Sequence, residues 1–358
     1  MQNSWRNRLG AVNVNSKMKD PTDTADRPGT VTADDVAERA GVSRWTVSRA
    51  FKKDAPISEK SRRKVLAAAK DLGYAPDLLA ASLASDRSNL VALVIDDFSN
   101  PHKLVMMERL TRILRQHGWG TLLVNTIDEE DASDALLTAS QRRVDAAVLI
   151  GSRFNDSVLA TALGARCVRK LILFARYSEN PDTISICCDD QQAMTTIADY
   201  VIKKGYRRPH FLAGPQTVSA HLLRKDTFIK RWQDTWGSTP SFSSVDVYDP
   251  QLAYTHMSDL LGGMDQSALP DIIVCENDAL AMGAVDAIQH QLNLSVPDDL
   301  AVIGFDDVPQ AVSPHYQLTT YRQPITAMAE GLVDVLKGQA DTKKLAQFSG
   351  QLVIRKSA

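Results

Sequence analysis

The sequence predicts an α/β protein in which a small all-α helix-turn-helix head precedes two Rossmann-like subdomains built on parallel sheets. Three observations predict this class. Residues 32–73 contain three helix patterns in succession, each preceded by a capping residue. From Leu90 onward, short runs of β-type residues alternate with helical stretches. These runs are apolar along their whole length, which is typical of parallel strands that helices cover on both faces.

Each helix expected in the head begins after a Ser or Thr that can cap it. The helices span 33–40, 44–51 and 59–72, with caps at Thr32, Ser43 and Ser58 and stops at Gly41 and Gly73. The third helix is expected to bury Val65, Leu66, Ala69 and Leu72. Two helices joined by a Gly-containing turn form a helix-turn-helix, whose second helix can lie in the major groove of DNA. The spacing by itself fits an ordinary helical pair with a solvated charged face equally well.

Runs of β-type residues continue to about residue 307. They occupy 90–96, 121–126, 146–151, 171–175, 184–189, 210–214, 245–249, 271–277 and 301–307. This number of strands fits two Rossmann-like halves better than one oversized sheet. Ligands of such sheets bind at the carboxyl ends of strands, where acidic and amide residues fall here: Asp96, Asp97, Asn125, Asn277, Asp278, Asp306 and Asp307. These ends predict a ligand cleft.

The composition is that of an ordinary globular protein. The 358 residues are 44% hydrophobic and 23% charged. No apolar run of about 18 residues and no signal-peptide pattern is present, so we expect no membrane segment and a cytoplasmic protein. Cys167, Cys187, Cys188 and Cys275 lack metal-site spacing, which predicts buried free thiols, with a vicinal Cys187–Cys188 switch as the alternative. No metal site, cofactor or catalytic residue is predicted.

The net charge of -2 hides an asymmetry along the chain. Residues 31–90 carry 11 Lys and Arg against 8 Asp and Glu, whereas the part that follows is acidic. A basic head on an acidic body predicts a polyanionic partner for the head alone.

Several motifs resemble the lactose/galactose repressor (LacI/GalR) family of bacterial transcription regulators. They are DVAERAGVSRWTVSRAF, ISEKSRRKVLAAAKDLGYAPDLLAASL and VALVIDDFSNP, followed by LAGP, ENDALAMGAVDAI, VPDDLAVIGFDD and LTTYRQP. The resemblance covers residues 31–338 in the family's order. It implies a periplasmic-binding-protein-like core and a homodimer on a roughly palindromic double-stranded operator. It also implies a cytoplasmic, nucleoid-associated repressor that a small-molecule effector controls.

The resemblance implies which side chains meet DNA. By position, Arg44 and Trp45 match the family's leading base-reading pair. A guanidinium can bond guanine bidentately, and an indole can contact a thymine methyl. Thr46, Ser48 and Arg49 are expected to contact phosphates or a neighbouring base. Trp45 as a core residue is the alternative.

Residue patterns divide the chain into four parts, to which the resemblance adds roles. Residues 1–30, which are polar and without period, are expected to form a disordered leader. Residues 31–75 are expected to form the helix-turn-helix DNA-binding domain, and the resemblance implies a hinge helix and linker at 76–89 and an effector-binding and dimerisation core at 90–358. Leu83 matches the leucine that relatives wedge into the minor groove, where it kinks the duplex. A buried Leu83 anchored against the core is the alternative.

Five residues match the family's effector cleft. Arg224 matches the arginine that clamps the ligand, and Asn277 and Asp306 match two other polar positions, which together suit a polyhydroxylated sugar. A surface charge, a helix cap and a turn former are their respective alternatives. His102 and Lys103 stand where many relatives have aromatic residues, which suggests an anionic effector such as a sugar acid or sugar phosphate.

Two other classes of protein share this architecture. A sugar-binding protein of transport needs a secretion signal and no DNA-binding head, whereas this sequence has the opposite on both counts. A sugar-related enzyme would need a catalytic motif, and GxGxxG, GxxxxGK(S/T), GxSxG and HExxH are all absent. We therefore predict a repressor without enzymatic activity.

Overall fold

The computed structural model describes residues 31–52, 55–76, 87–126, 129–152, 154, 168–216, 222–339 and 345–358. The chain divides into two compact units, Met1–Ala81 and Ser82–Ala358, and each is described by itself. The expected leader, residues 1–30, lies outside the described residues, as does most of the expected hinge, including Leu83.

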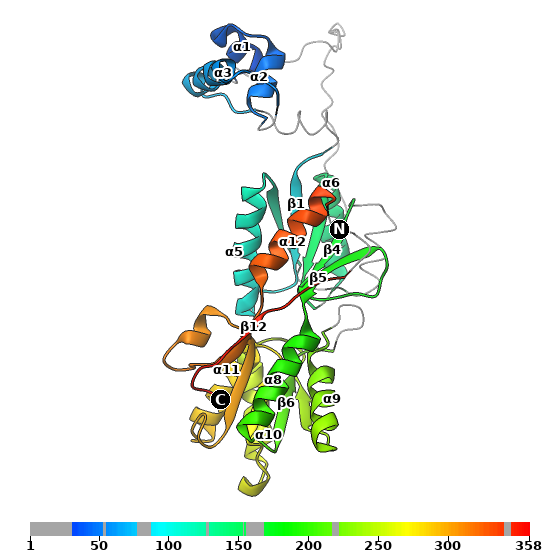
Figure 1. Ribbon diagram of the computed structural model, residues 1–358, viewed down its shortest axis with the longest axis vertical. Coiled ribbons are helices and arrows are strands. Elements are labelled where there is room, and N and C mark those ends of the chain that lie inside the picture. Colours follow the sequence, from blue (N-terminus) through cyan, green and yellow to red (C-terminus); the bar gives the residue numbers. More distant parts are fainter. Residues whose placement is uncertain are drawn as a thin grey trace, which may run out of the picture. The chain divides into compact units, whose positions relative to one another are not determined.

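The first unit contains three helices that start at the expected residues, and the second ends one residue earlier than expected. They are α1 (Ala33–Ala40), α2 (Arg44–Ala50) and α3 (Glu59–Leu72) (Figure 1). At the start of α1, the backbone N–H of Asp35 donates to the Thr32 hydroxyl and the Asp35 carboxylate accepts from the Thr32 N–H, a reciprocal capping box. The hydrogen bonds that the Asp35 carboxylate accepts from the Thr32 backbone N–H and hydroxyl hold the pKa of Asp35 below its usual range. Gly41 ends the helix at a φ of 64°, a left-handed conformation that glycine adopts without strain.

The head has its own small core. Val36, Val47 and Val65 contribute one fully buried side chain from each helix, and each contributes about 1.5–3 kcal/mol of burial energy. The expectation that Leu66 is buried is wrong, because its side chain is 43% exposed. The inward stripe of α3 runs through Val65, Ala68 and Ala69, and Leu66 lies one helical position, about 100°, away from it.

The second unit holds two six-stranded sheets, each forming one lobe (Figure 1). The first sheet has the order β11-β5-β4-β3-β1-β2, and its described pairings are parallel. Its strands are β1 (Leu90–Ile95), β2 (Gly120–Asn125), β3 (Ala146–Ile150), β4 (Leu171–Phe174), β5 (Thr183–Cys188) and β11 (Ala346–Phe348).

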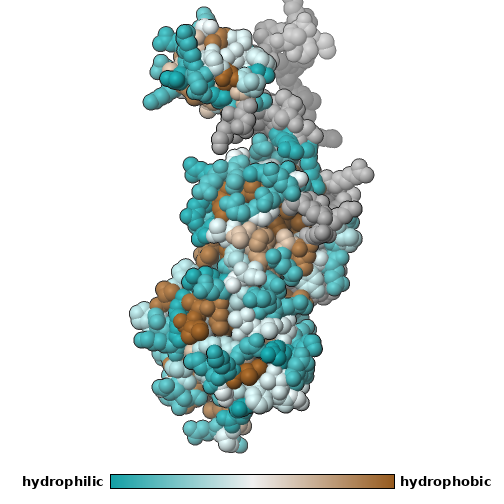
Figure 2. Space-filling model, viewed as in Figure 1, coloured by the Kyte–Doolittle hydropathy of each residue, from teal (hydrophilic) through white to brown (hydrophobic). Residues whose placement is uncertain are grey.

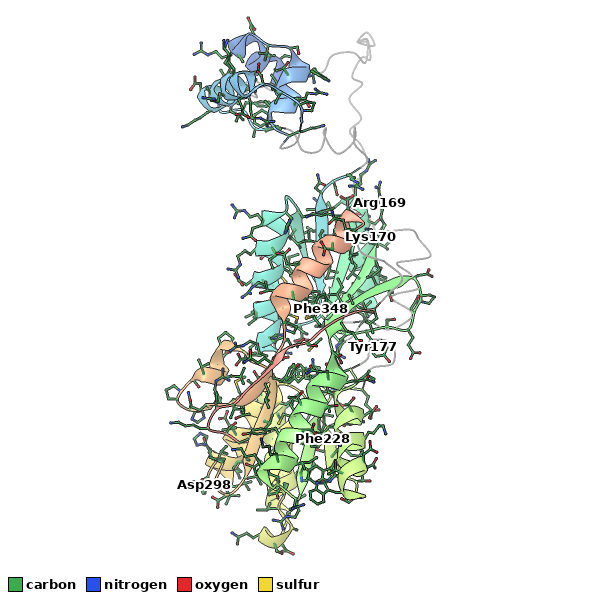
Figure 3. All side chains as sticks on the ribbon, viewed as in Figure 1. Arg169, Lys170, Tyr177, Phe228, Asp298 and Phe348 are labelled. Atoms are coloured by element: carbon green, nitrogen blue, oxygen red, sulfur yellow. The ribbon has the colours of Figure 1, made fainter. Side chains whose placement is uncertain are left out.

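Helices cover both faces of the first sheet because its strand residues alternate between two apolar clusters. Leu93 faces α5 (Pro101–Gln116) and α12 (Ile325–Lys337), whereas Val94 faces α6 (Glu129–Gln141). Phe348 on β11 packs over Gly331 of α12, where an added Cβ would lie 2.6 Å from the ring (Figure 3). The central strands β1, β3, β4 and β5 are therefore buried on both sides, as predicted, whereas the edge strand β2 contains no buried residue.

The second sheet has the order β12-β10-β9-β8-β6-β7, with β12 antiparallel to its neighbour. Its strands are β6 (Pro209–Ala213), β7 (Ser241–Ser244), β8 (Ile272–Cys275), β9 (Ala301–Asp306), β10 (Thr319–Arg322) and β12 (Gln351–Val353). The helices of this lobe are α8 (Asp190–Lys204), α9 (Arg224–Trp236), α10 (Pro250–Gly262) and α11 (Asp278–Asp286). Three short helical turns complete it: η1 (Gln266–Ala268), η2 (Ala287–Gln291) and η3 (Pro309–Val312).

Phe211 and Phe228 pack between the second sheet and helices α8 and α9, whereas Leu212 packs on the other face with α10 and α11 (Figure 3). The α/β class with two parallel-sheet lobes is confirmed. The described residues contain twelve strands rather than nine or ten. The extra strands escape a hydropathy search because β10 buries Thr319 and Thr320 and because β11 and β12 have three residues each.

Two further expectations need correction. The expected strand 245–249 is a loop, and the edge strand β7 lies just before it with the polar sequence SFSS. Val245 and Tyr248 are buried because they pack against α10, not because they belong to a strand. The lobes are also not successive halves of the sequence, since α12 and β11 return to the first lobe after β10.

Three of the four cysteines lie in the part of the chain that the structure describes, and Cys167 lies outside it. Cys187, Cys188 and Cys275 are free and buried, and burial raises the pKa of Cys187 and Cys188 to about 12. Most of the face in Figure 2 is hydrophilic, with apolar residues gathered in separate patches. Among the helices that the structure describes, none combines the length and hydropathy needed to cross a bilayer.

Candidate functional site

Helix α2 presents polar and cationic side chains outward because its apolar residues face the head core. Val47 and Ala50 are buried, whereas Arg44, Trp45 and Ser48 are exposed. Trp45 is 63% exposed, so the alternative that it belongs to the core is wrong. The Thr46 hydroxyl lies 3.0 Å from the hydroxyl of the capping Ser43.

Arg49 and Trp45 form a stacked pair on this surface. The guanidinium carbon of Arg49 lies 3.5 Å from the centroid of the Trp45 ring, and Nη1 of Arg49 donates to the carbonyl of Pro56 over 3.0 Å. Arg44 forms an exposed ion pair of 3.3 Å with Asp34 of α1. Such an exposed pair contributes about 0–1 kcal/mol, so Arg44 can exchange Asp34 for another anion at little cost.

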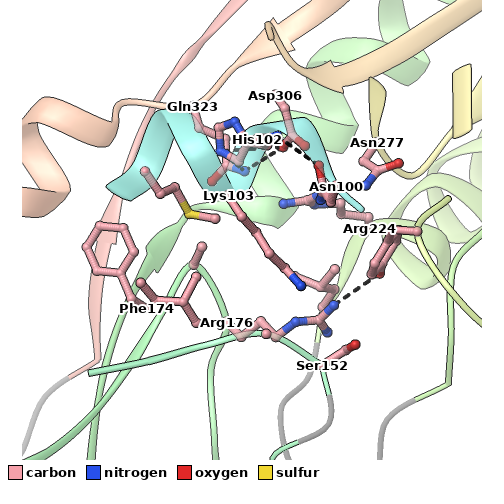
Figure 4. Close-up of a pocket in the computed structure, with 16 residues that line it drawn as sticks. Asn100, His102, Lys103, Ser152, Phe174, Arg176, Arg224, Asn277, Asp306 and Gln323 are labelled. Atoms are coloured by element: carbon pink, nitrogen blue, oxygen red, sulfur yellow. Dashed lines mark hydrogen bonds and ion pairs between the residues drawn. The ribbon is translucent and has the colours of Figure 1, made fainter. Parts of the chain in front are cut away.

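In the second unit, a pocket lies between the two lobes, at the carboxyl ends of the strands (Figure 4). Both sheets reverse their strand order here, between β1 and β3 and between β6 and β8, which is where open α/β sheets bind ligands. The structure brings all five sequence-predicted cleft residues into the lining: His102, Lys103, Arg224, Asn277 and Asp306. Five residues expected nearby from their place at strand ends do not line it: Asp96, Asp97, Asn125, Asp278 and Asp307.

Lys103 is held by carboxylates rather than free to attract an anion. Its ammonium pairs with both Asp96 and Asp97 at the end of β1. Burial alone would raise the pKa of Asp96, but the charge and the hydrogen bond of Lys103 outweigh burial, so the pKa of Asp96 is lowered. Gly151 admits the Asp96 carboxyl, since a Cβ at this position would lie 2.1 Å from it.

His102 belongs to a buried group with Gln323 and Asp306 (Figure 4). Nε2 of Gln323 donates to Oδ1 of Asp306 over 2.7 Å and lies 3.3 Å from Nε2 of His102. Burial lowers the pKa of His102, and the nearby Asp306 carboxylate only partly opposes this, so the ring is neutral at pH 7. Because Nε2 faces an amide donor, the proton resides on Nδ1.

This arrangement leaves one donor and one acceptor unmatched at the pocket. Nδ1 of His102 and Oε1 of Gln323 are buried and have no hydrogen-bond partner among the described residues. A buried polar atom without a partner costs about 1–3 kcal/mol. A ligand hydroxyl can both donate and accept, so it suits this pair of atoms.

Arg224 is held in place by residues of the second lobe. Its Nε donates to Asp190 over 3.0 Å, its Nη1 donates to the carbonyl of Glu276 over 2.8 Å, and its guanidinium carbon lies 3.6 Å from the Phe305 ring centroid. Burial opposes the charged form, but the carboxylates of Asp190 and other neighbours raise the pKa of Arg224. The residue is 3% exposed, which excludes its alternative as a surface charge.

Asn277 and Asp306 also occupy defined places. The Asn277 side chain accepts the Leu280 N–H and so caps α11, and it lines the pocket as well. Asp306 ends β9 at a φ of 122°, and its carboxylate is buried. The helix-cap alternative for Asn277 and the turn-former alternative for Asp306 are therefore both compatible with a place in the pocket lining.

Sequence reasoning missed several lining residues: Asn100, Ser152, Phe174, Arg176, Tyr248 and Gln323. Gln323 follows β10 directly, and Ser152 and Arg176 are each the second residue after a strand, which is a weak signal for a place in the pocket. The Arg176 guanidinium donates to the Tyr248 hydroxyl over 3.1 Å. Gln191 and Gln192, at the start of α8, do not line the pocket.

A helix-turn-helix head joined to a two-lobed ligand cleft defines an effector-responsive DNA-binding regulator. The family model for bacterial regulatory proteins of the lacI family matches residues 32–77, and the model for a periplasmic binding protein-like domain matches residues 198–358.

Individual relatives agree with this class. The chain is 30% identical over 325 residues to the ribose operon repressor of Escherichia coli (strain K12), covering 90% of this chain and 96% of that protein. It is 27% identical over 332 residues to the HTH-type transcriptional repressor PurR of Klebsiella pneumoniae (strain 342), covering 91% and 96%. A structure of the Lac repressor dimer bound to operator and the anti-inducer ONPF superposes with a TM-score of 0.75 and 25% identity, covering 92% and 99%.

The chain belongs to the LacI family of bacterial regulatory proteins. It is a DNA-binding transcriptional repressor with a ligand-binding effector domain. The relatives named above are repressors rather than enzymes.

Proposed function

We propose that α2 reads the operator through Arg44 and Trp45, with Thr46, Ser48 and Arg49 contacting phosphates or a neighbouring base. The observation that supports this most is the stack of Arg49 on the exposed Trp45 ring. A stacked indole is held in one orientation before DNA arrives, so less side-chain entropy is lost on binding. The Arg44 guanidinium needs only to leave its exposed pair with Asp34 to reach a guanine.

The protein acts in this proposal as a homodimer on a roughly palindromic operator. The Lac repressor structure named above is a dimer on its operator, which supports the same arrangement here. Leu83 would enter the minor groove at the operator centre, where a wedge kinks the duplex. A protein that binds chromosomal operators in this way works in the cytoplasm at the nucleoid, and we expect it to have no catalytic activity.

The effector in this proposal is a neutral polyhydroxylated molecule of the sugar class. The unmatched donor on His102 and acceptor on Gln323 support it, because hydroxyl groups satisfy both. The two residues that suggested an anion from the sequence do not support one, because Lys103 is neutralised by two carboxylates and His102 is neutral. The other charged lining residues are Arg176, Arg224 and Asp306. A sugar acid or sugar phosphate, which His102 and Lys103 suggested from the sequence, would have to displace these ion pairs.

Ligand and operator binding are coupled through the effector domain in this proposal. A ligand that contacts residues of both lobes stabilises one relative position of the lobes and changes operator affinity by a coupling energy of about 1–3 kcal/mol. The sign of that change, induction or corepression, is an outcome of the experiment below.

The DNA part is tested with an operator selected by the full-length protein from a random DNA library. Arg44→Ala and Trp45→Ala should each weaken the selected operator by about 1–3 kcal/mol, roughly 5- to 150-fold. Arg142→Ala, which removes an exposed arginine of the second unit, is the control and should leave affinity unchanged. If Arg44→Ala and Trp45→Ala bound the selected operator as tightly as the control variant and the parent do, α2 would be excluded as the helix that reads the operator.

The effector part is tested by calorimetry with neutral pentoses and hexoses, sugar acids and sugar phosphates. Asp306→Asn should weaken the best ligand about 10- to 100-fold, as expected for a lost hydrogen bond to a charged group. Asp298→Asn, at an exposed position, is the control. Tight binding of the phosphates with neutral sugars ignored would overturn the neutral assignment.

A further inference from the structure

Three side chains of metal-ligating type gather on the second lobe, apart from the ligand cleft. Asp286 ends α11, His290 lies in the π-helical turn η2 that follows directly, and His315 comes three residues after η3. One ligand atom of each residue lies within 4.8 Å of the others. None of them lines the cleft between the lobes. The sequence indicated no metal site because His315 is distant along the chain from the other two.

Local structure already orients these groups toward one another. Asp286 and His290 stand four residues apart on one continuous helical segment, so they share a face. The His290 and His315 rings lie nearly parallel, at 6° with centroids 5.5 Å apart. Nε2 of His315 is 2.9 Å from one Asp286 carboxylate oxygen, and the Tyr316 hydroxyl donates to the other over 3.2 Å.

A hydrogen bond between His315 and Asp286 accounts for two of these residues but not for the third. The ring nitrogens of His290 have no hydrogen bond to a described residue, yet the ring is stacked against His315. Two imidazole nitrogens and one carboxylate oxygen are the donor set of zinc sites with an open position, with bonds of about 2.0–2.2 Å. Ca²⁺ and Mg²⁺ prefer oxygen ligands alone, so this set selects a transition-metal ion.

We propose that Asp286, His290 and His315 bind one Zn²⁺ ion. All three side chains border a surface hollow of about 790 Å³, which Tyr254 and Tyr316 also line. His290 and His315 are exposed, so their rings can move the short distance needed to bring all three donors to bonding distance. The hollow leaves the fourth zinc position open to water or another donor. The hydrogen bond from Tyr316 holds the Asp286 carboxylate, as partners of metal ligands commonly do.

The ion would join the loop after η3 to the end of α11. Zn²⁺ that binds the folded chain and not the unfolded one raises the melting temperature by mass action. The structure thus assigns to this lobe a metal-dependent stability that is separate from operator and effector binding.

The test uses the full-length chain, stripped with EDTA and dialysed, and titrated with zinc chloride by calorimetry. We expect one Zn²⁺ per chain, a higher melting temperature with zinc, and a visible absorption band with Co²⁺ in its place. His290→Gln and His315→Gln should each weaken binding at least about 10-fold and abolish the band. His117→Gln is the matched control, because His117 is also paired with a carboxylate, Glu330 at 3.0 Å, but has no second histidine beside it.

Folding of the variants is checked by their melting temperature in EDTA, which should equal that of the parent because both histidines are exposed. Asp286→Asn provides a third variant that can retain the hydrogen bond from Tyr316. Zinc binding that survives His290→Gln and His315→Gln together, or an absence of zinc binding by the parent, would overturn the proposal.

Discussion

The buried ion pair of Arg224 and Asp190 allows a prediction of defined magnitude. Arg224→Met removes a hydrogen bond of 3.0 Å to the Asp190 carboxylate and one of 2.8 Å to the Glu276 carbonyl. Hydrogen bonds to charged groups contribute about 1.5–3 kcal/mol each. Asp190 is 8% exposed, so it would be left as a buried charge without its partner. Removing one partner of a buried pair costs about 3–5 kcal/mol, and we expect the free energy of unfolding to fall by that amount.

A double-mutant cycle separates the pair from the loss of packing. Asp190→Asn alone should also destabilise, but combining it with Arg224→Met should cost at least about 2 kcal/mol less than the sum of the single changes. Urea unfolding followed by far-ultraviolet circular dichroism measures each free energy of unfolding. Arg231→Met is the control, because Arg231 of α9 pairs with Asp199 at the surface and should contribute about 0–1 kcal/mol.

Additive single changes, within about 0.5 kcal/mol, would refute the buried pair as the origin of the loss. A loss of more than about 2 kcal/mol for Arg231→Met would refute the distinction between buried and exposed pairs on which the magnitude rests.

Three further predictions concern other parts of the chain. Burial lowers the pKa of His210 to about 4, so between pH 6.5 and pH 4 the unfolded chain binds a proton that the folded chain does not. The free energy of unfolding should therefore fall by about 3 kcal/mol over this range, and His210→Asn should remove this contribution in urea unfolding measured against pH. Gly283→Ala should destabilise the second unit by about 3 kcal/mol, because the added Cβ would lie 2.1 Å from the Pro250 carbonyl oxygen; a thermal melt at or above that of the parent would contradict this. Val47→Ala should cost the head about 2 kcal/mol and weaken operator binding while effector binding stays unchanged, which gel shift and calorimetry would check together.

Local signals in the sequence predicted the head well. A helix start depends on one capping residue and a helix stop on one glycine, so Thr32, Ser43, Ser58, Gly41 and Gly73 could be read without tertiary information. The exposure of Leu66 could not be predicted in this way, since it depends on which face of α3 packs against the other two helices.

The strands of the two lobes divide in the same way. Fully buried strands are apolar throughout and are visible in the sequence. The edge strand β7 instead exposes serines, and β10 buries Thr319 and Thr320, whose hydroxyls form hydrogen bonds with residues distant in the chain. The return of α12 and β11 to the first lobe depends on contacts between residues far apart in the chain, which no local pattern contains.

The sequence by itself determined the protein's class, its parallel sheets and the five cleft residues, because strand ends and family motifs are local features. Only the tertiary structure decided what those residues can do. The sequence indicates a free cation at Lys103, but in the folded protein its ammonium pairs with Asp96 and Asp97. Gln323 acquired a role only because folding placed its amide next to His102, 221 positions away. Charge and hydrogen-bonding capacity depend on which neighbours a side chain meets, and folding alone supplies those neighbours.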